Sequence, residues 1–131
     1  MSPGTSIEIA AALTVLVGAG FGLPIPWAAW RLRQTGHLPT FIGLFPMYGG
    51  PLFPRVSHRT FTLVLLSFAA VCALDVLAGL ALWRDDRDAA ILVLALLPVE
   101  AAYWVAFALP IPPVIAVVRV ALLAFGWRAL V

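Results

Sequence analysis

Three ionisable residues interrupt long apolar stretches of the sequence: Asp75, Glu100 and Arg119. A charge at the depth of a lipid hydrocarbon core costs about 2.5 to 3.5 kcal/mol on insertion scales, so such residues are expected to face protein rather than lipid. If these stretches are helices that cross a bilayer, a rise of 1.5 Å per residue puts Asp75 about 13 Å, Glu100 about 18 Å and Arg119 about 21 Å below one surface. An Arg side chain spans the last gap. We therefore expect an ion pair between Glu100 and Arg119, with Asp75 nearby.

The charge balance of this cluster predicts its protonation. If all three groups were charged, the cluster would carry one excess negative charge in a low dielectric, which disfavours one ionised carboxylate. We expect Asp75 to be the protonated group. Three neighbours on the same helical faces would support the cluster. Cys72 is small enough to let another helix approach, while Tyr103 and Trp104 would bring a hydroxyl and an indole N–H to within one turn of Glu100.

Two interpretations of the cluster remain open from the sequence. Polar side chains often hold helices together inside membranes, and in that case the three residues are structural. Intramembrane ionisable residues also mark proton and substrate sites, and in that case the cluster is functional.

The composition predicts that the apolar stretches lie in lipid. Of 131 residues, 63% are apolar and 11% are charged, against about 45 to 50% and 25% in typical globular domains. A soluble domain of this size would bury only about two-thirds of its unfolded surface and would leave large apolar patches in water. We therefore expect an integral membrane protein. No Lys or Arg precedes the first apolar stretch, which we interpret as a retained span rather than a signal peptide.

Four segments come close to the length of about 20 apolar residues that a helix needs to cross the hydrocarbon core. They are approximately 7–30, 60–83, 89–109 and 113–127. Prolines predict a kink at Pro24 and Pro26 in the first segment and an interruption at Pro98 in the third. The expected fold class is all-α: a polytopic membrane protein in which residues 1–131 form a single membrane domain, a four-transmembrane-helix bundle.

The connection between the first two segments, residues 34–59, is long and apolar. Four glycines and four prolines within it oppose a long helix. Irregular backbone at membrane depth persists only against protein or water. Residues 41–53 are therefore either an interfacial flap, which we favour because loops usually lie at surfaces, or a re-entrant segment packed on the bundle.

Several kinds of site are not expected. The eight basic residues are all Arg and are scattered, which predicts no nucleic-acid partner. The single cysteine, Cys72, permits neither an intramolecular disulfide nor a cysteine-based metal site. His37 and His58 lack a second ligand motif nearby, so we expect no metal, and no phosphate-binding loop or nucleophile motif predicts a cofactor.

Arginines near the ends of the spans predict the orientation, because short cytoplasmic loops are enriched in them. Arg31, Arg33, Arg55 and Arg59 lie on one side of the expected bundle, and Arg84, Arg87 and Arg128 on the other. This count favours a multi-pass protein of the plasma membrane with both termini outside. The expected partners are the lipid bilayer and either a second copy of the chain or another membrane protein.

A three-residue string in the third segment suggests one enzymatic alternative. Pro98, Val99 and Glu100 resemble the Pro-x-Glu motif of small membrane-bound lycopene cyclase subunits. Ala101 and Ala102 follow it here, whereas those subunits carry acidic and aromatic residues. The resemblance implies a membrane enzyme acting on an isoprenoid or lipid, with Glu100 as an acid.

Three functions are therefore compatible with the sequence. We favour a small accessory or interaction protein whose buried charges specify helix pairing, because four short spans enclose little volume. The second is a proton-coupled transporter or channel protomer, with Asp75 and Glu100 carrying the proton. The third is a lipid or isoprenoid enzyme with residues 41–53 shielding its substrate.

Overall fold

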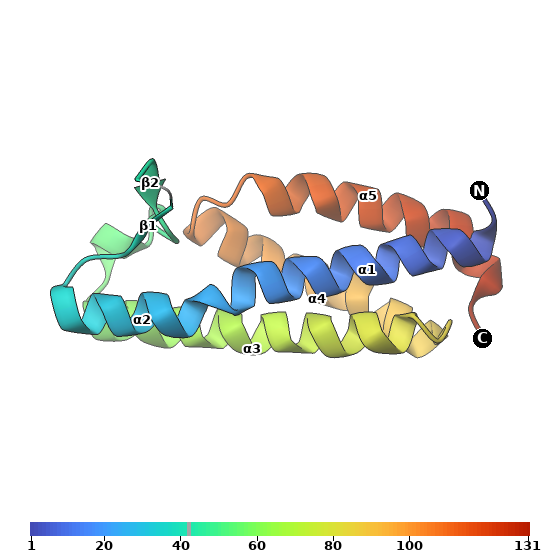
Figure 1. The fold of residues 1–131 in the computed structure, drawn as a ribbon, viewed down its shortest axis with the longest axis horizontal. Coiled ribbons are helices and arrows are strands. Elements are labelled where there is room, and N and C mark those ends of the chain that lie inside the picture. Colours follow the sequence, from blue (N-terminus) through green and yellow to red (C-terminus); the bar gives the residue numbers. More distant parts are fainter. Residues whose placement is uncertain (42) are drawn as a thin grey trace.

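The computed structural model describes residues 1–41 and 43–131, and within them the chain is an antiparallel helical bundle (Figure 1). Its helices are α1 (Pro3–Gly22), α2 (Pro24–Thr35), α3 (His58–Leu82), α4 (Arg87–Ala106) and α5 (Ile111–Gly126). The shorter elements are β1 (Thr40–Phe41), β2 (Phe45–Pro46) and the 3₁₀ turns η1 (Phe53–Arg55) and η2 (Trp127–Ala129). Because α1 and α2 follow one another along the same side, the bundle has four rods and both termini lie at one end.

The four rods are each long and apolar enough to cross a membrane. These candidate spans are Pro3–Thr35, His58–Leu82, Arg87–Ala106 and Ile111–Ala129. Each begins two to four residues before the boundary expected from the apolar pattern. The reason is local: polar capping residues precede three of the helices, since Ser2, Ser57 and Asp86 each accept a backbone N–H of the first turn.

Prolines affect the two spans that contain them differently. The kink expected in the first span lies at Leu23, between α1 and α2, and Leu23 itself keeps helical dihedral angles of −61° and −39°. Pro24 and Pro26 occupy the start of α2, where the missing backbone N–H costs least. The interruption expected at Pro98 is absent, because α4 continues through this residue as one helix. A lone proline removes a single backbone hydrogen bond, which the turns on either side tolerate.

The outer surface of the bundle is apolar along every rod. Large side chains that face outward include Leu16 (66% exposed), Leu77 (63%), Val105 (72%) and Val117 (72%). A helix that is apolar on its outer face as well as its inner face is typical of a membrane span. The all-helical fold thus has the surface expected of a protein located in a membrane.

The interior contains two apolar layers, one toward each end of the bundle. The layer near the long connection, which we call the loop-end layer, includes Ile25, Leu32, Phe61, Leu65, Phe68, Cys72, Trp104, Phe107 and Ala116. The layer near the termini, the terminal layer, includes Ile7, Ala10, Ala11, Ala78, Leu82, Ala90, Val93 and Leu123. The polar cluster described below separates them.

Helices α1 and α3 pack with their backbones unusually close, because glycines line their contact. A Cβ added to Gly18 would lie 2.7 Å from the backbone oxygen of Cys72, and one added to Gly79 would lie 3.1 Å from that of Ala11. Small residues permit this approach, and close packing replaces the hydrophobic effect as the force that joins helices in lipid.

The connection between α2 and α3 lies across one end of the bundle rather than between the helices (Figure 1). It packs against the end of α4 there, with the Leu52 N–H donating to the backbone oxygen of Ala106, and both the flap and the re-entrant interpretation allow this contact. The β1–β2 pairing forms a short antiparallel turn, with Thr40 opposite Pro46. Tyr48 anchors the connection: it is 4% exposed, its ring meets that of Phe107 at 5.6 Å, and its hydroxyl donates a 2.6 Å hydrogen bond to the backbone oxygen of Phe21.

We expect Tyr48→Phe to destabilise the protein by about 1 kcal/mol at neutral pH, because one short hydrogen bond is lost. Burial raises the pKa of Tyr48 above its usual value of 10.0. As pH rises, the Tyr48 hydroxyl therefore ionises in the unfolded state before it does in the folded state. The contribution of this residue to the free energy of unfolding falls above about pH 10. Chemical unfolding in detergent at pH 9 and pH 11 should show the gap between wild type and variant narrowing at the higher pH. A gap that widens would contradict the assignment.

Candidate functional site

Three helices each contribute one ionisable side chain to the middle of the bundle. Asp75 of α3, Glu100 of α4 and Arg119 of α5 are 0%, 1% and 0% exposed. The structure thus brings together the three residues singled out from the sequence. We call them the charge layer.

The position of the charge layer follows from the apolar pattern of its helices. On α3, Asp75 lies between Cys72 of the loop-end layer and Ala78 of the terminal layer. On α5, Arg119 lies in the same way between Ala116 and Leu123. Residues three and four apart share a helix face, so each charged side chain points inward with its apolar neighbours.

Glu100 and Arg119 form an ion pair that is not a hydrogen bond. Their closest charged atoms, Glu100 Oε2 and Arg119 Nη2, are 3.8 Å apart, beyond hydrogen-bonding distance. Among the described residues, no group accepts a hydrogen bond from the Nε, Nη1 or Nη2 atoms of Arg119. The attraction is therefore purely coulombic, in surroundings where charges are only weakly screened.

Asp75 and Glu100 form the second contact of the layer. The two buried carboxyl groups are neighbours, and a hydrogen bond between them requires that one of them carries a proton. Without that proton, neither Oδ1 nor Oδ2 of Asp75 has a donor among the described residues. One shared proton would join one oxygen of each carboxyl group and would leave the layer electrically neutral.

The three supporting residues lie near the layer but do not complete its hydrogen bonds. Cys72 is 3% exposed and packs in the loop-end layer, as does Trp104 at 8%. Tyr103 points elsewhere: its hydroxyl pairs with Ser67 Oγ at 2.8 Å, on a more exposed side of α3 and α4. The expectation that Tyr103 would bring its hydroxyl to Glu100 is therefore wrong, because the Ser67 hydroxyl one helix away offers a partner.

The sequence did not single out Gly18 as part of this site. A Cβ on Gly18 would lie 3.1 Å from Cβ of Asp75, so α1 closes the charge layer on the side of Asp75. Small residues in the first span were a signal for close packing, but only the fold shows which helix they meet.

The donor set of the layer does not suit a metal ion. Arg119 already supplies a positive charge beside the two carboxyl groups, which opposes the binding of a cation. Within residues 1–41 and 43–131, no three His, Cys, Asp or Glu residues gather closely enough to hold one.

The arrangement supports two kinds of chemistry. It can hold α3, α4 and α5 together by charge, and its carboxyl pair can bind or release one proton. Comparisons with protein-family models, with curated proteins and with solved structures find no match to this chain.

Proposed function

We propose that the protein is a small accessory or interaction protein of the plasma membrane, whose charge layer fixes the pairing of α3, α4 and α5. One observation carries this proposal: Asp75, Glu100 and Arg119 are all sealed from the surface, at 1% exposure or less. A site that binds or moves a substrate needs a path to it. A charge cluster that only specifies packing does not.

The surface grooves of the bundle support the same conclusion. One lies between α2 and α3 near their polar ends, and another lies between α1 and α3. Neither is lined by any residue of the charge layer. The outward-facing apolar side chains are therefore the surface that a partner would meet, either a second copy of the chain or another membrane protein.

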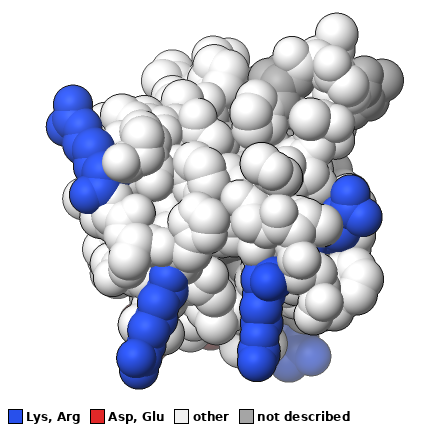
Figure 2. Space-filling model, turned by 90° about the vertical axis from the view of Figure 1, so that its left-hand side faces the viewer, with Lys and Arg blue, Asp and Glu red and all other residues white. Residues whose placement is uncertain are grey.

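The distribution of charge supports an orientation with both termini outside the cell. Arg31, Arg33, Arg55 and Arg59 lie at the end formed by the long connection, and Figure 2 shows Arg side chains projecting from this end. The opposite end combines Arg84, Arg87 and Arg128 with Glu8, Asp85, Asp86 and Asp88. Because basic residues favour the cytoplasmic side, the end without acidic residues would lie there.

Labelling of introduced cysteines tests this orientation. Cys72 is buried, so the wild-type chain should give little background with a membrane-impermeant maleimide. We expect Ser2→Cys to be labelled on intact cells and Thr40→Cys only after the membrane is permeabilised. The reverse pattern would place the long connection outside and would refute the proposed orientation.

A second function, proton-coupled transport, is favoured by one observation: two carboxyl groups, those of Asp75 and Glu100, are buried together in the middle of the bundle beside Arg119. Proton flux into reconstituted vesicles separates the two functions. The accessory function predicts that wild type, Asp75→Asn and Glu100→Gln all match empty vesicles. Flux that is present in wild type and lost in both variants would replace the accessory function by transport.

A further inference from the structure

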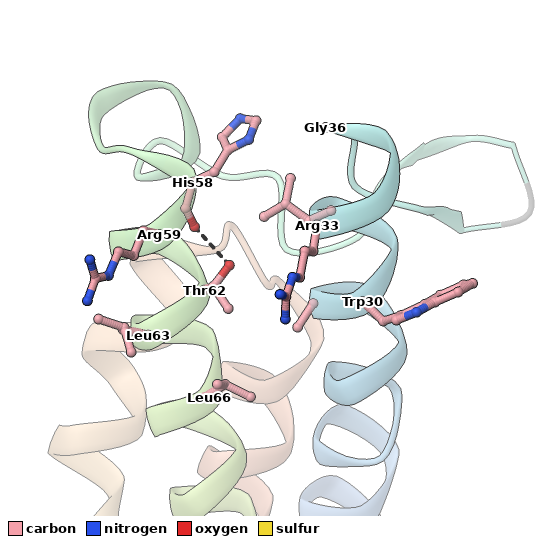
Figure 3. A pocket seen from close by; sticks show the side chains of 10 residues that line it. Trp30, Arg33, Gly36, His58, Arg59, Thr62, Leu63 and Leu66 are labelled. Atoms are coloured by element: carbon pink, nitrogen blue, oxygen red, sulfur yellow. Dashed lines mark hydrogen bonds between the residues drawn. The ribbon is translucent and has the colours of Figure 1, made fainter.

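The groove between the end of α2 and the start of α3 has the properties of a lipid headgroup site. Its volume is about 660 Å³, and it is open to the surrounding medium at the Arg-rich end of the bundle. Its lining changes from basic to apolar along its length. The mouth is lined by Arg33, His58 and Arg59, and the part further along α3 is lined by Leu63 and Leu66. Figure 3 shows the Arg33 side chain pointing from α2 into the gap, with His58 above it.

Helical spacing produces this order. Arg59, Leu63 and Leu66 are four and seven residues apart, so they follow one another down one face of α3. At 1.5 Å per residue, the distance from Arg59 to Leu66 along the helix is about 10 Å. A phospholipid has the same order along its length, with an anionic phosphate at the surface followed by the beginning of its acyl chains.

The cationic groups at the mouth are free to bind an anion. Arg33 and Arg59 are both exposed, and no acidic side chain in the described parts of the chain forms an ion pair with either. The Thr62 hydroxyl donates its hydrogen to the backbone oxygen of His58 at 2.8 Å, so it is not available as a donor for a ligand. Figure 3 shows the Arg33 guanidinium pointing into the gap, whereas the Arg59 side chain points away from α2 and has to turn toward the gap to reach the same ligand. Both guanidinium groups then supply donors, and their geometry suits bidentate phosphate binding.

Two further features keep the mouth open and shaped. His58 stacks on Phe53 of the long connection, with ring centroids 5.5 Å apart. Gly36 lines the groove opposite, and its φ of 73° favours glycine, which has no side chain to fill the opening. Trp30, also in the lining, is 56% exposed, at the depth where aromatic side chains meet lipid headgroups.

We propose that this groove binds one anionic phospholipid, with Arg33 and Arg59 holding the phosphate and the face of α3 at Leu63 and Leu66 receiving the upper part of an acyl chain. The inference goes beyond the accessory function and does not depend on it. It also explains why Arg33 and Arg59 have no acidic partners in the described chain: the partner charge is supplied by lipid.

Native mass spectrometry of the full-length protein tests the site. The protein is reconstituted in vesicles of equal parts phosphatidylglycerol and phosphatidylcholine, extracted in mild detergent, and the retained lipid is identified. We expect about tenfold or greater enrichment of phosphatidylglycerol, as two arginines near an anionic surface provide. The double variant Arg33→Gln with Arg59→Gln should lose this enrichment.

The sequence offers a matched control for net charge. Arg31 and Arg55 lie at the same end and are exposed, but they do not line the groove. The double variant Arg31→Gln with Arg55→Gln should keep the enrichment. Equal loss in both double variants would show a general attraction of the Arg-rich end to anionic lipid and would overturn the site. Wild-type protein that retains both lipids equally would overturn it without any variant.

Discussion

Arg119→Met is expected to destabilise the bundle by about 3 to 5 kcal/mol, because it leaves Glu100 buried without its positive partner. The free energy of unfolding of a typical protein is about 5 to 15 kcal/mol in total, so this one substitution removes a large part of it. Methionine is chosen because its unbranched apolar side chain fills an irregular space with little strain. Reversible unfolding in mixed detergent micelles, followed by circular dichroism, measures the loss.

The double variant Glu100→Leu with Arg119→Met distinguishes a structural pair from a functional one. Removing both members of a buried ion pair is often neutral or even stabilising, whereas removing one is not. We therefore expect the double variant to recover most of the stability that Arg119→Met loses. Asp75 can then stay neutral by keeping its proton. Arg128→Met controls for the loss of an exposed arginine near the end of the same rod and should change stability by less than about 0.5 kcal/mol. The single variant Glu100→Leu completes the comparison. If the losses of Glu100→Leu and Arg119→Met simply add in the double variant, the pair does not hold the helices together.

The apolar pattern alone was sufficient to predict the helical architecture. In lipid, long apolar stretches are expected to form helices, because each helix satisfies its own backbone hydrogen bonds. Depth along a helix can also be counted from residue spacing, because the rise per residue is constant. This is why Asp75, Glu100 and Arg119 can be selected as a group from their positions in the sequence.

Residue spacing does not predict which helix faces which. Tyr103 follows Glu100 by one turn, yet its hydroxyl is directed to Ser67 of α3, since the rotation of α4 against α3 decides the partner. The close backbone contact between α1 and α3 joins segments separated by the whole long connection. Apolar periodicity is weak in helices that are apolar on all sides. It therefore does not predict how each helix is rotated about its axis, and so which face packs inward.

The glycines of α1 instead determine which face of this helix packs on α3. We therefore expect Gly18→Val to disrupt the bundle strongly. The new Cβ would lie 2.7 Å from the backbone oxygen of Cys72 and 3.0 Å from Cγ2 of Val76. A backbone atom of a continuous helix cannot step aside, so α1 and α3 must separate. We expect a loss of stability of about 3 kcal/mol, the upper part of the range for overpacked cores, measured by the same unfolding assay.

Gly20→Val is the matched control, because a Cβ on Gly20 would meet nothing within 4 Å. It places the same side chain in the same helix, two residues away and facing outward. We expect it to leave the stability within about 0.5 kcal/mol of wild type. Similar losses in both variants would mean that the β-branched residue weakens α1 itself, and that close backbone packing is not the cause.

The two variants should also differ at the charge layer. Gly18 closes the layer beside Asp75, with 3.1 Å between the added Cβ and that of the aspartate. Separation of α1 from α3 therefore exposes a buried carboxyl group to water or lipid. Hydrogen exchange followed by mass spectrometry should show faster exchange in the part of α3 around Asp75 for Gly18→Val and unchanged exchange for Gly20→Val. Because α1 contributes no charge to the layer, unchanged exchange in both variants would mean that α3, α4 and α5 hold the layer closed by their ion pair alone.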